Sequence, residues 1–255
     1  MINILLFIAF IIIVNIIIGK FNLLPNYSGN DHQIFANEGN IQLSGGIFIL
    51  ILFIILFFNE FILICFFTSI FLIGLASDKN LLTSPKKRLI LQIIIVLSFV
   101  YIFNLRIFET RVEIINSLLS NNLLAYIFAS FCILVLINGS NFIDGLNSLL
   151  LGYLIIILFV IFKLDLLNQI GLNQDKIYFL FSILFFVMIM NYFNLLFLGD
   201  SGSYLIGLFS SFLIISIYNL NLNSISPYFI IVLVWYPCFE NLFSIIRKKL
   251  NNLSP

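Results

Sequence analysis

Three aspartates in this sequence stand where apolar runs end, each beside glycine, serine or asparagine. Asp78 lies in GLASDKN, Asp144 in NGSNFIDGLN and Asp200 in FLGDSGS. A carboxylate at the boundary of an apolar segment is costly and is usually kept for a function. Carboxylates that lie together repel one another, and a divalent cation that prefers hard oxygen ligands, Mg²⁺ or Mn²⁺, relieves the repulsion. If the fold brings them together, they predict a metal-assisted phosphoryl-transfer site.

Small and basic residues near these aspartates suit the same chemistry. Gly199 permits a tight backbone and the close approach of a ligand. Ser201 and Ser203 are expected to cap a helix that starts near residue 203, which would leave helix amides for an anion. The basic residues at 86–88, in SPKKR, are expected to hold a phosphate or diphosphate.

The elements that must position these residues are membrane helices. The chain has 255 residues, of which 62% are hydrophobic and 9% are charged, whereas a soluble domain carries about 25% charged residues. This composition predicts an all-α polytopic membrane protein. The net charge of +1 gives no bulk attraction to nucleic acid. The three cysteines are far apart within apolar segments, so neither a disulfide framework nor a cysteine metal site is indicated.

Apolar runs bounded by polar clusters predict a bundle of about nine transmembrane helices. Only Asn59 and Glu60 divide the second run from the third, and we interpret them as the turn of a helical hairpin. No long linker and no repeat divide the chain, so we expect residues 1–255 to form a single integral-membrane domain. The predicted spans are 2–19, 46–58, 60–76, 88–105, 122–138, 147–162, 176–192, 203–219 and 227–246.

Nine spans place the connections alternately on two sides of the membrane. The connections on one side, with the basic residues next to them, hold eight of the twelve basic residues: Lys20, Lys79, Lys86, Lys87, Arg88, Arg247, Lys248 and Lys249. The positive-inside rule makes that side cytoplasmic and puts the N-terminus outside. SGG (44–46) and all three aspartates then fall on the cytoplasmic face, which predicts a shared site there in the inner (cytoplasmic) membrane.

Each motif taken alone also has a structural explanation. SGG suits a flexible helix start, GDSGS and Asp144-Gly145 suit turns or caps, and SPKKR suits a positively charged membrane anchor. Their order, spacing and common side of the membrane favour the shared site over the separate explanations.

The motifs also resemble those of a known family, the polyprenyl-phosphate N-acetylhexosamine-1-phosphate transferases of glycosyltransferase family 4. The resemblance covers nearly the whole chain, in order, through LSGG, GLASDKN, SPKKRLILQ, NGSNFIDGLNSL, FLGDSGSYLIG and WYPCFENLFSIIRKK. The NxxNxxDG and GDSGS elements are specific, whereas SGG is not.

The resemblance implies an enzyme that transfers a sugar 1-phosphate from a UDP-N-acetylhexosamine to a polyprenyl phosphate, with UMP as the second product. It implies Mg²⁺ as cofactor, a cytoplasmic active site, and a role in initiating cell-envelope polysaccharide such as lipopolysaccharide O-antigen. The family fold is a bundle of about ten or eleven transmembrane helices. The sugar, the length of the prenyl chain and the oligomeric state stay open.

The resemblance also implies roles for individual residues. Asp200 matches the metal-binding aspartate of the family, and Asp144 matches a position that lies at the metal or the nucleotide, so both are expected to hold the metal. Asp78 matches one that positions or deprotonates the acceptor, which makes these three the catalytic set. Substrate binding is implied for a larger set: Arg88, Lys87, Asn138, Asn141, Asn147, Gly199 and Ser201.

Three departures from the family pattern bear on this interpretation. The family has two adjacent aspartates where this chain has Ser77-Asp78, and one of that pair is proposed as the base. Gln42 replaces the proline before x-x-Gly-Gly. The chain ends at NNLSP, where a cytoplasmic His-x-His-His loop and a last helix would follow, so we expect a C-terminally truncated domain.

Two other functions are compatible with some of these features. An inactive or incomplete relative would bind UDP-sugar without turnover, and the serine at position 77 and the missing loop favour it. A transporter would place its carboxylates near the bilayer midplane and show internal repeats, whereas these aspartates stand at one boundary.

Overall fold

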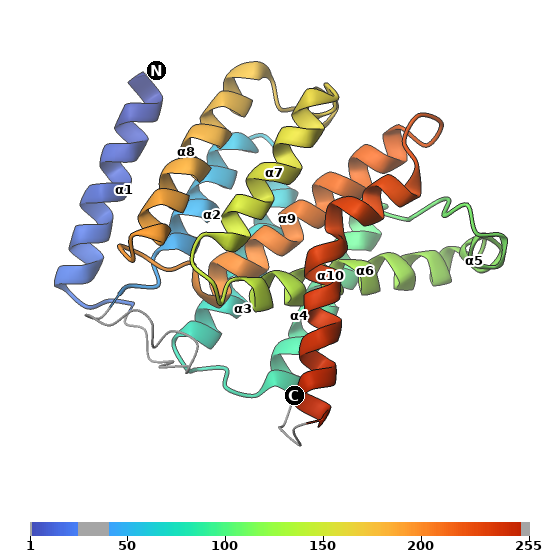
Figure 1. The fold of residues 1–255 in the computed structure, drawn as a ribbon, viewed down its shortest axis with the longest axis horizontal. Helices are drawn as coiled ribbons and strands as arrows, with labels where there is room; N and C mark the ends of the chain where they lie inside the picture. Colours follow the sequence, from blue (N-terminus) through green and yellow to red (C-terminus); the bar gives the residue numbers. More distant parts are fainter. Residues whose placement is uncertain (1, 25–40, 251–255) are drawn as a thin grey trace.

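The computed structural model describes residues 2–24 and 41–250, which form α-helices and one 3-10 helix without a β-strand. NNLSP, where the family's histidine loop was expected to begin, lies outside the described residues, as does most of the connection 20–45. The helices are α1 (Ile2–Lys20), α2 (Gly45–Leu56), α3 (Phe61–Asp78), α4 (Pro85–Ile102), α5 (Glu113–Leu119), α6 (Asn122–Ile143), α7 (Leu149–Lys163), η2 (Leu167–Ile170), α8 (Gln174–Tyr192), α9 (Gly199–Leu220) and α10 (Pro227–Leu250) (Figure 1).

Each of the nine predicted spans corresponds to a helix, so the prediction of an all-α polytopic membrane protein is confirmed. Six helices are long and apolar enough to cross a membrane, namely α1, α3, α6, α8, α9 and α10. Two others, α2 and α7, are apolar but shorter than the roughly 20 residues of a full span. The short helices α5 and η2 were not predicted.

The predicted hairpin between the second and third spans is present. Helix α2 ends at Leu56, α3 begins at Phe61, and the amide of Glu60 donates to the carbonyl of Phe57 at 2.8 Å. The turn is therefore built from the few residues around Asn59 and Glu60 that divide the two apolar runs.

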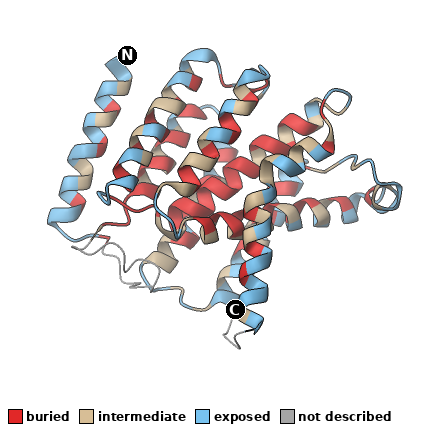
Figure 2. Ribbon diagram, viewed as in Figure 1, coloured by how far each residue is buried: buried red, intermediate tan, exposed pale blue. Residues whose placement is uncertain are grey.

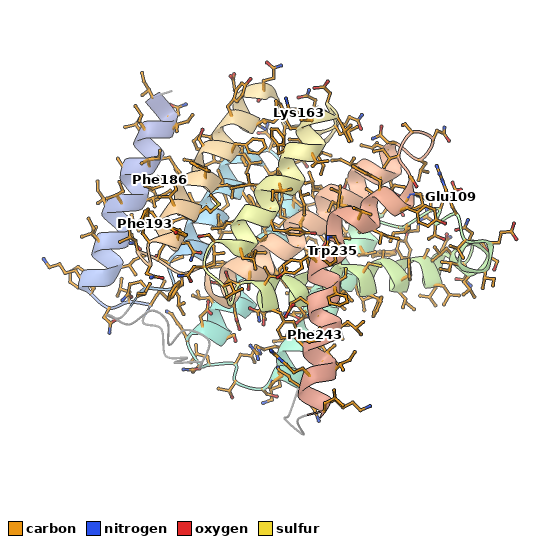
Figure 3. All side chains as sticks on the ribbon, viewed as in Figure 1. Glu109, Lys163, Phe186, Phe193, Trp235 and Phe243 are labelled. Carbon is orange, nitrogen blue, oxygen red and sulfur yellow. The ribbon has the colours of Figure 1, made fainter. Side chains whose placement is uncertain are left out.

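Helix α9 is the centre of the bundle. Of its most apolar window 78% is buried, against 17% for α1 and 11% for α10, and Figure 2 shows α9 as an almost continuous buried stretch. Small residues allow this close packing, since a Cβ added to Gly207 would lie 2.6 Å from the Cα of Ile137 on α6. On the peripheral helix α10, Trp235 and Phe243 (Figure 3) are about half exposed, as lipid-facing aromatic residues are.

Several predicted helix boundaries differ from the structure by two to five residues, and two of these differences bear on the site. Helix α6 continues to Ile143 instead of ending at 138, and α9 begins at Gly199 instead of 203. Asn138 and Asn141 therefore lie one turn apart on a helix, and Asp200 lies in the first turn of α9. Polar residues suggested loops here, but their side chains are satisfied by neighbouring helices, so the helical backbone continues.

The motif-bearing helix ends meet at one end of the bundle. Hydrogen bonds join the last turn of α3 to the first turns of α4 and α9, and the last turn of α6 to α9. Figure 1 shows the end of α3, the start of α4 and the end of α10 on the lower side of the bundle, with the start of α1 on the upper side. This arrangement agrees with the prediction that the connections between helices alternate between the two sides of the membrane, which put the motifs on one side.

Candidate active site

An ion pair between α4 and α9 lies at the centre of the site. Arg88 Nη1 lies 2.8 Å from Asp200 Oδ2, and both side chains are about one quarter exposed, at 25% and 24%. Ser84 precedes Pro85 at the first position of α4, which starts that helix and places Arg88 in its first turn. The two charged residues that the sequence assigned to phosphate and metal are thus in direct contact.

Two hydroxyl groups complete this contact. Ser77 Oγ donates to Asp200 Oδ2 at 2.6 Å and accepts from Arg88 Nη1 at 2.7 Å. Tyr204 Oη lies 3.4 Å from the same carboxylate oxygen. Ser77, Arg88, Asp200 and Tyr204 form what we call the α3–α4–α9 network.

Asp78 binds the N-terminus of α9. Its Oδ1 accepts from the amide of Asp200 at 2.8 Å and its Oδ2 accepts from the amide of Ser201 at 3.1 Å. Helix N-termini leave amides without partners and favour negative charge, so this carboxylate caps α9 from another helix. The expectation that Ser201 and Ser203 cap this helix was wrong, because Asp78 takes its first amides.

Glycines allow the two segments to come this close. Gly199 has φ +71°, and a Cβ there would lie 2.7 Å from Asp78 Oδ2. A Cβ at Gly74, one turn earlier on α3, would lie 2.4 Å from the Cα of Ser201. The tight backbone expected at Gly199 is present, and the group that comes close to it is the carboxylate of Asp78, whereas the predicted approach of a ligand stays a prediction.

The SGG motif joins the start of α2 to the segment before α9. Gly45 and Gly46 donate their amides to the carbonyls of Phe197 and Leu198 at 2.9 and 3.2 Å, and the carbonyl of Gln42 accepts from the amide of Phe197 at 3.0 Å. A side chain at Gly46 would lie 2.6 Å from the backbone nitrogen of Gly202. The motif therefore holds α9 in place through its backbone.

The asparagines of NGSNFIDGLN divide between the interior and the rim. Asn141 Oδ1 accepts from Ser203 Oγ at 2.9 Å, which links α6 to the first turn of α9. Asn138 donates to the buried Gln92 Oε1 at 3.1 Å, one turn further into the bundle. Asn147 is exposed and hydrogen-bonded to Asn194, outside the α3–α4–α9 network.

Asp144 directly follows α6 and is coupled electrostatically to the other two aspartates. Burial, and then the charges on Asp200 and Asp78, raise the pKa of Asp144 well above its ordinary value. The charges of these three aspartates therefore act on one another at this end of the bundle. Among the described residues, no group of three or more His, Cys, Asp or Glu side chains is arranged to hold a metal ion.

The sequence alone did not identify Tyr204 and Gln92 as parts of the site, and it identified Ser77 only as a departure from the family pattern. Tyr204 follows Asp200 by four residues and Gln92 follows Arg88 by four, which puts each pair on one helix face. That four-residue spacing is the feature of the sequence that could have linked Tyr204 and Gln92 to the site. Ser77 was noticed only because it replaces an aspartate. Lys87, predicted to bind phosphate, is exposed at the start of α4.

Comparison with known proteins supplies the family. A sequence model for glycosyl transferase family 4 matches residues 60–218, which is more than half of the chain. The chain belongs to glycosyl transferase family 4. The match begins just before α3 and ends in α9, so all four residues of the α3–α4–α9 network lie within the family 4 region. No curated protein and no solved structure matches the chain significantly.

Membership of family 4 confirms the resemblance read from the motifs. The chain is a membrane-embedded member of a family of sugar-phosphate transferases, and its motif residues meet at one end of the helix bundle. SGG and α10 lie outside the matched region, although the SGG backbone bonds directly to the segment before α9.

Proposed function

We propose that this family 4 protein transfers a sugar 1-phosphate from a UDP-N-acetylhexosamine to a polyprenyl phosphate. The observation that supports this most is the contact between Arg88 and Asp200, with Asp144 and Asp78 electrostatically coupled to it. A guanidinium beside several carboxylates at the end of a membrane bundle suits a doubly anionic diphosphate and a cation together.

The cofactor proposed for these carboxylates is a divalent cation, Mg²⁺ or Mn²⁺, because hard oxygen ligands suit such ions. Asp200 and Asp144 would hold it. Burial is the main cause of the raised pKa of Asp144, the charges on Asp200 and Asp78 add to it, and a cation would relieve the repulsion between these charges. Two protein carboxylates suffice, because Mg²⁺ usually completes its shell with water and substrate phosphate. When bound, the cation supplies neutralisation of charge on the diphosphate and on the departing UMP.

Arg88 is proposed to orient the phosphates. Its Nη1 contacts Asp200 and Ser77, and a guanidinium has five N–H donors, so its other donors can bind phosphate oxygen. An oxygen of the lipid phosphate attacks the β-phosphorus of the UDP-sugar. A P–O bond to the lipid forms, the bond from the β-phosphorus to the bridging oxygen breaks, and UMP leaves with that oxygen.

Asp78 is proposed to hold the N-terminus of α9 in position and not to serve as a base. Both of its oxygens accept amides of that helix, which commits the carboxylate to holding the backbone of Asp200 and Ser201. A strong base is not required, since the second pKa of a phosphate is about 6 and the lipid phosphate is largely ionised near neutral pH.

The proposal also includes the side of the membrane on which the site lies and the route by which the lipid reaches it. Basic residues concentrate at the end of the bundle that carries the site, which supports a cytoplasmic active site in the inner membrane. The lipid acceptor would reach the site from the bilayer, and the product would initiate a cell-envelope polysaccharide of the O-antigen type.

The test is UMP release from membranes that contain the protein, with polyprenyl phosphate, Mg²⁺ and a panel of UDP-sugars. Release should require both the lipid and the cation. It should be lost in Asp200→Asn, which keeps the size of the side chain and removes its charge. The matched control is Asp165→Asn, at an exposed position with φ +55° that asparagine tolerates. Full activity of Asp200→Asn would refute the assignment, and UDP-sugar binding without release would favour an inactive relative.

A further inference from the structure

The side-chain carboxylate of Asp200 has hydrogen-bond partners on only one of its two oxygens, among the described residues. Within the described part of the chain, Ser77, Arg88 and Tyr204 reach Oδ2, at 2.6, 2.8 and 3.4 Å, and the hydrogen bonds to this side chain involve that oxygen alone. A carboxylate held through one oxygen has a fixed orientation, and its second oxygen keeps its lone pairs for another ligand.

The direction of the hydrogen bond from Ser77 follows from the chemistry of its neighbours. Arginine has only donors, so at the 2.7 Å contact the Ser77 oxygen must accept from Arg88 Nη1. The single hydroxyl proton of Ser77 is then directed to Asp200 Oδ2, 2.6 Å away. Neither a carboxylate nor an alanine at this position can both accept from Arg88 and donate to Asp200.

We propose that Ser77 is a positioning residue of the transfer site. Its hydroxyl, oriented by Arg88, holds Oδ2 of Asp200, and this leaves Oδ1 as the oxygen that would be available to a divalent cation. The inference rests on the proposed function, because it takes Asp200 as a ligand of that cation. It assigns Ser77 no contact with substrate, and it gives a role to the residue that stands where the family pattern has an aspartate.

The test measures Mn²⁺ binding to the purified, substrate-free protein in detergent micelles, by the electron paramagnetic resonance signal of unbound Mn²⁺. Ser77→Ala should weaken binding about tenfold, the usual effect of losing a hydrogen bond to a charged group. Ser77→Thr keeps a hydroxyl and should restore binding to within about twofold of wild type. The matched control is Ser69→Ala on the same helix, whose hydroxyl donates to the carbonyl of Cys65 at 2.7 Å.

Turnover gives the second measurement. The Mg²⁺ concentration for half-maximal UMP release should rise about tenfold in Ser77→Ala, with a smaller loss of kcat at saturating Mg²⁺. A residue with a merely structural role would lower kcat or the folded yield without moving the Mg²⁺ dependence. If Mn²⁺ binding to the wild type is too weak to measure, the Mg²⁺ dependence of UMP release distinguishes a positioning role of Ser77 from a structural one.

The outcomes separate this inference from the proposed function. If wild type releases UMP but Ser77→Ala matches it in Mn²⁺ binding and Mg²⁺ dependence, the role of Ser77 is overturned and the proposed function stands. If wild type neither binds Mn²⁺ nor releases UMP, both are overturned. If Ser77→Ala does not fold, the isosteric pair Ser77→Thr and Ser77→Val replaces it, and equal Mn²⁺ binding by that pair would overturn the inference.

Discussion

Replacing Asp78 with asparagine keeps the size of the side chain but leaves one acceptor atom where the carboxylate has two. The structure uses both oxygens, for the amides of Asp200 and Ser201 at 2.8 and 3.1 Å. In Asp78→Asn an NH₂ group faces one of these amides, so a hydrogen bond is lost, and the negative charge at the N-terminus of α9 is lost with it.

The cost can be worked out from these contacts. A hydrogen bond to a charged group contributes about 1.5–3 kcal/mol, and a carboxylate at a helix N-terminus adds about 0.3–1 kcal/mol. Because Asp78 is only partly buried, we expect the free energy of unfolding to fall by about 2–3 kcal/mol. Turnover should fall too, since the lost bonds hold the backbone of Asp200.

The assay is unfolding of the purified protein in detergent micelles by titration with SDS, followed by circular dichroism. Asp175→Asn is the matched control, because Asp175 is an exposed acidic residue in the first turn of α8. It should change stability by less than about 0.5 kcal/mol. If Asp78→Asn unfolds like wild type and yet loses turnover, Asp78 acts on the substrate and our reasoning about the cap is wrong.

Three further perturbations follow from the same geometry. Gly199→Ala should lower the free energy of unfolding in SDS by at least about 2 kcal/mol, because position 199 has a left-handed backbone and the added Cβ would clash with Asp78. Gly171→Ala is the control: it has φ +80° and nothing within 4 Å of the added Cβ, so it should lose only about 1 kcal/mol through backbone strain. Gly74→Ala should destabilise by about 1–3 kcal/mol because its Cβ would lie 2.4 Å from α9, whereas Gly152→Ala, with its nearest contact at 3.7 Å, should be neutral or stabilising in the same titration; equal effects would contradict the packing argument. Chelation with EDTA should abolish UMP release, and added Mg²⁺ or Mn²⁺ should restore it; release that persists in EDTA would contradict a metal-dependent site.

The sequence predicted the helices and their common end because hydropathy and charge asymmetry are properties of whole segments. A run of apolar residues must cross the bilayer as a helix, since its backbone has no other hydrogen-bond partners there. Alternation then places Asp78 and Asp200 at the same end of the bundle, although 122 positions separate them.

The finer geometry of the site lay beyond the sequence, because it depends on contacts between helices. The residues next to Asp78 in the sequence do not show that its hydrogen-bond partners are amides of α9. The serines of GDSGS have the residue type of a helix cap, and only the structure shows that a residue of another helix caps α9. Ser77 was interpreted as a loss relative to the family pattern, whereas its hydroxyl joins Arg88 to Asp200. Polar residues at a helix end do not reveal whether the helix stops, and for that reason the end of α6 was predicted too early.

The central claim is that a phosphate moves together with the sugar, and the fate of the β-phosphate tests it most directly. Membranes containing the protein would be given polyprenyl phosphate, Mg²⁺ and UDP-N-acetylhexosamine labelled with ³²P in the β-phosphate, and the lipids would then be extracted. We predict that the label enters the lipid fraction while unlabelled UMP stays in water, and that Asp200→Asn blocks this transfer. Label that remains in water as UDP while the sugar enters the lipid would contradict the account, because only the sugar would then have been transferred.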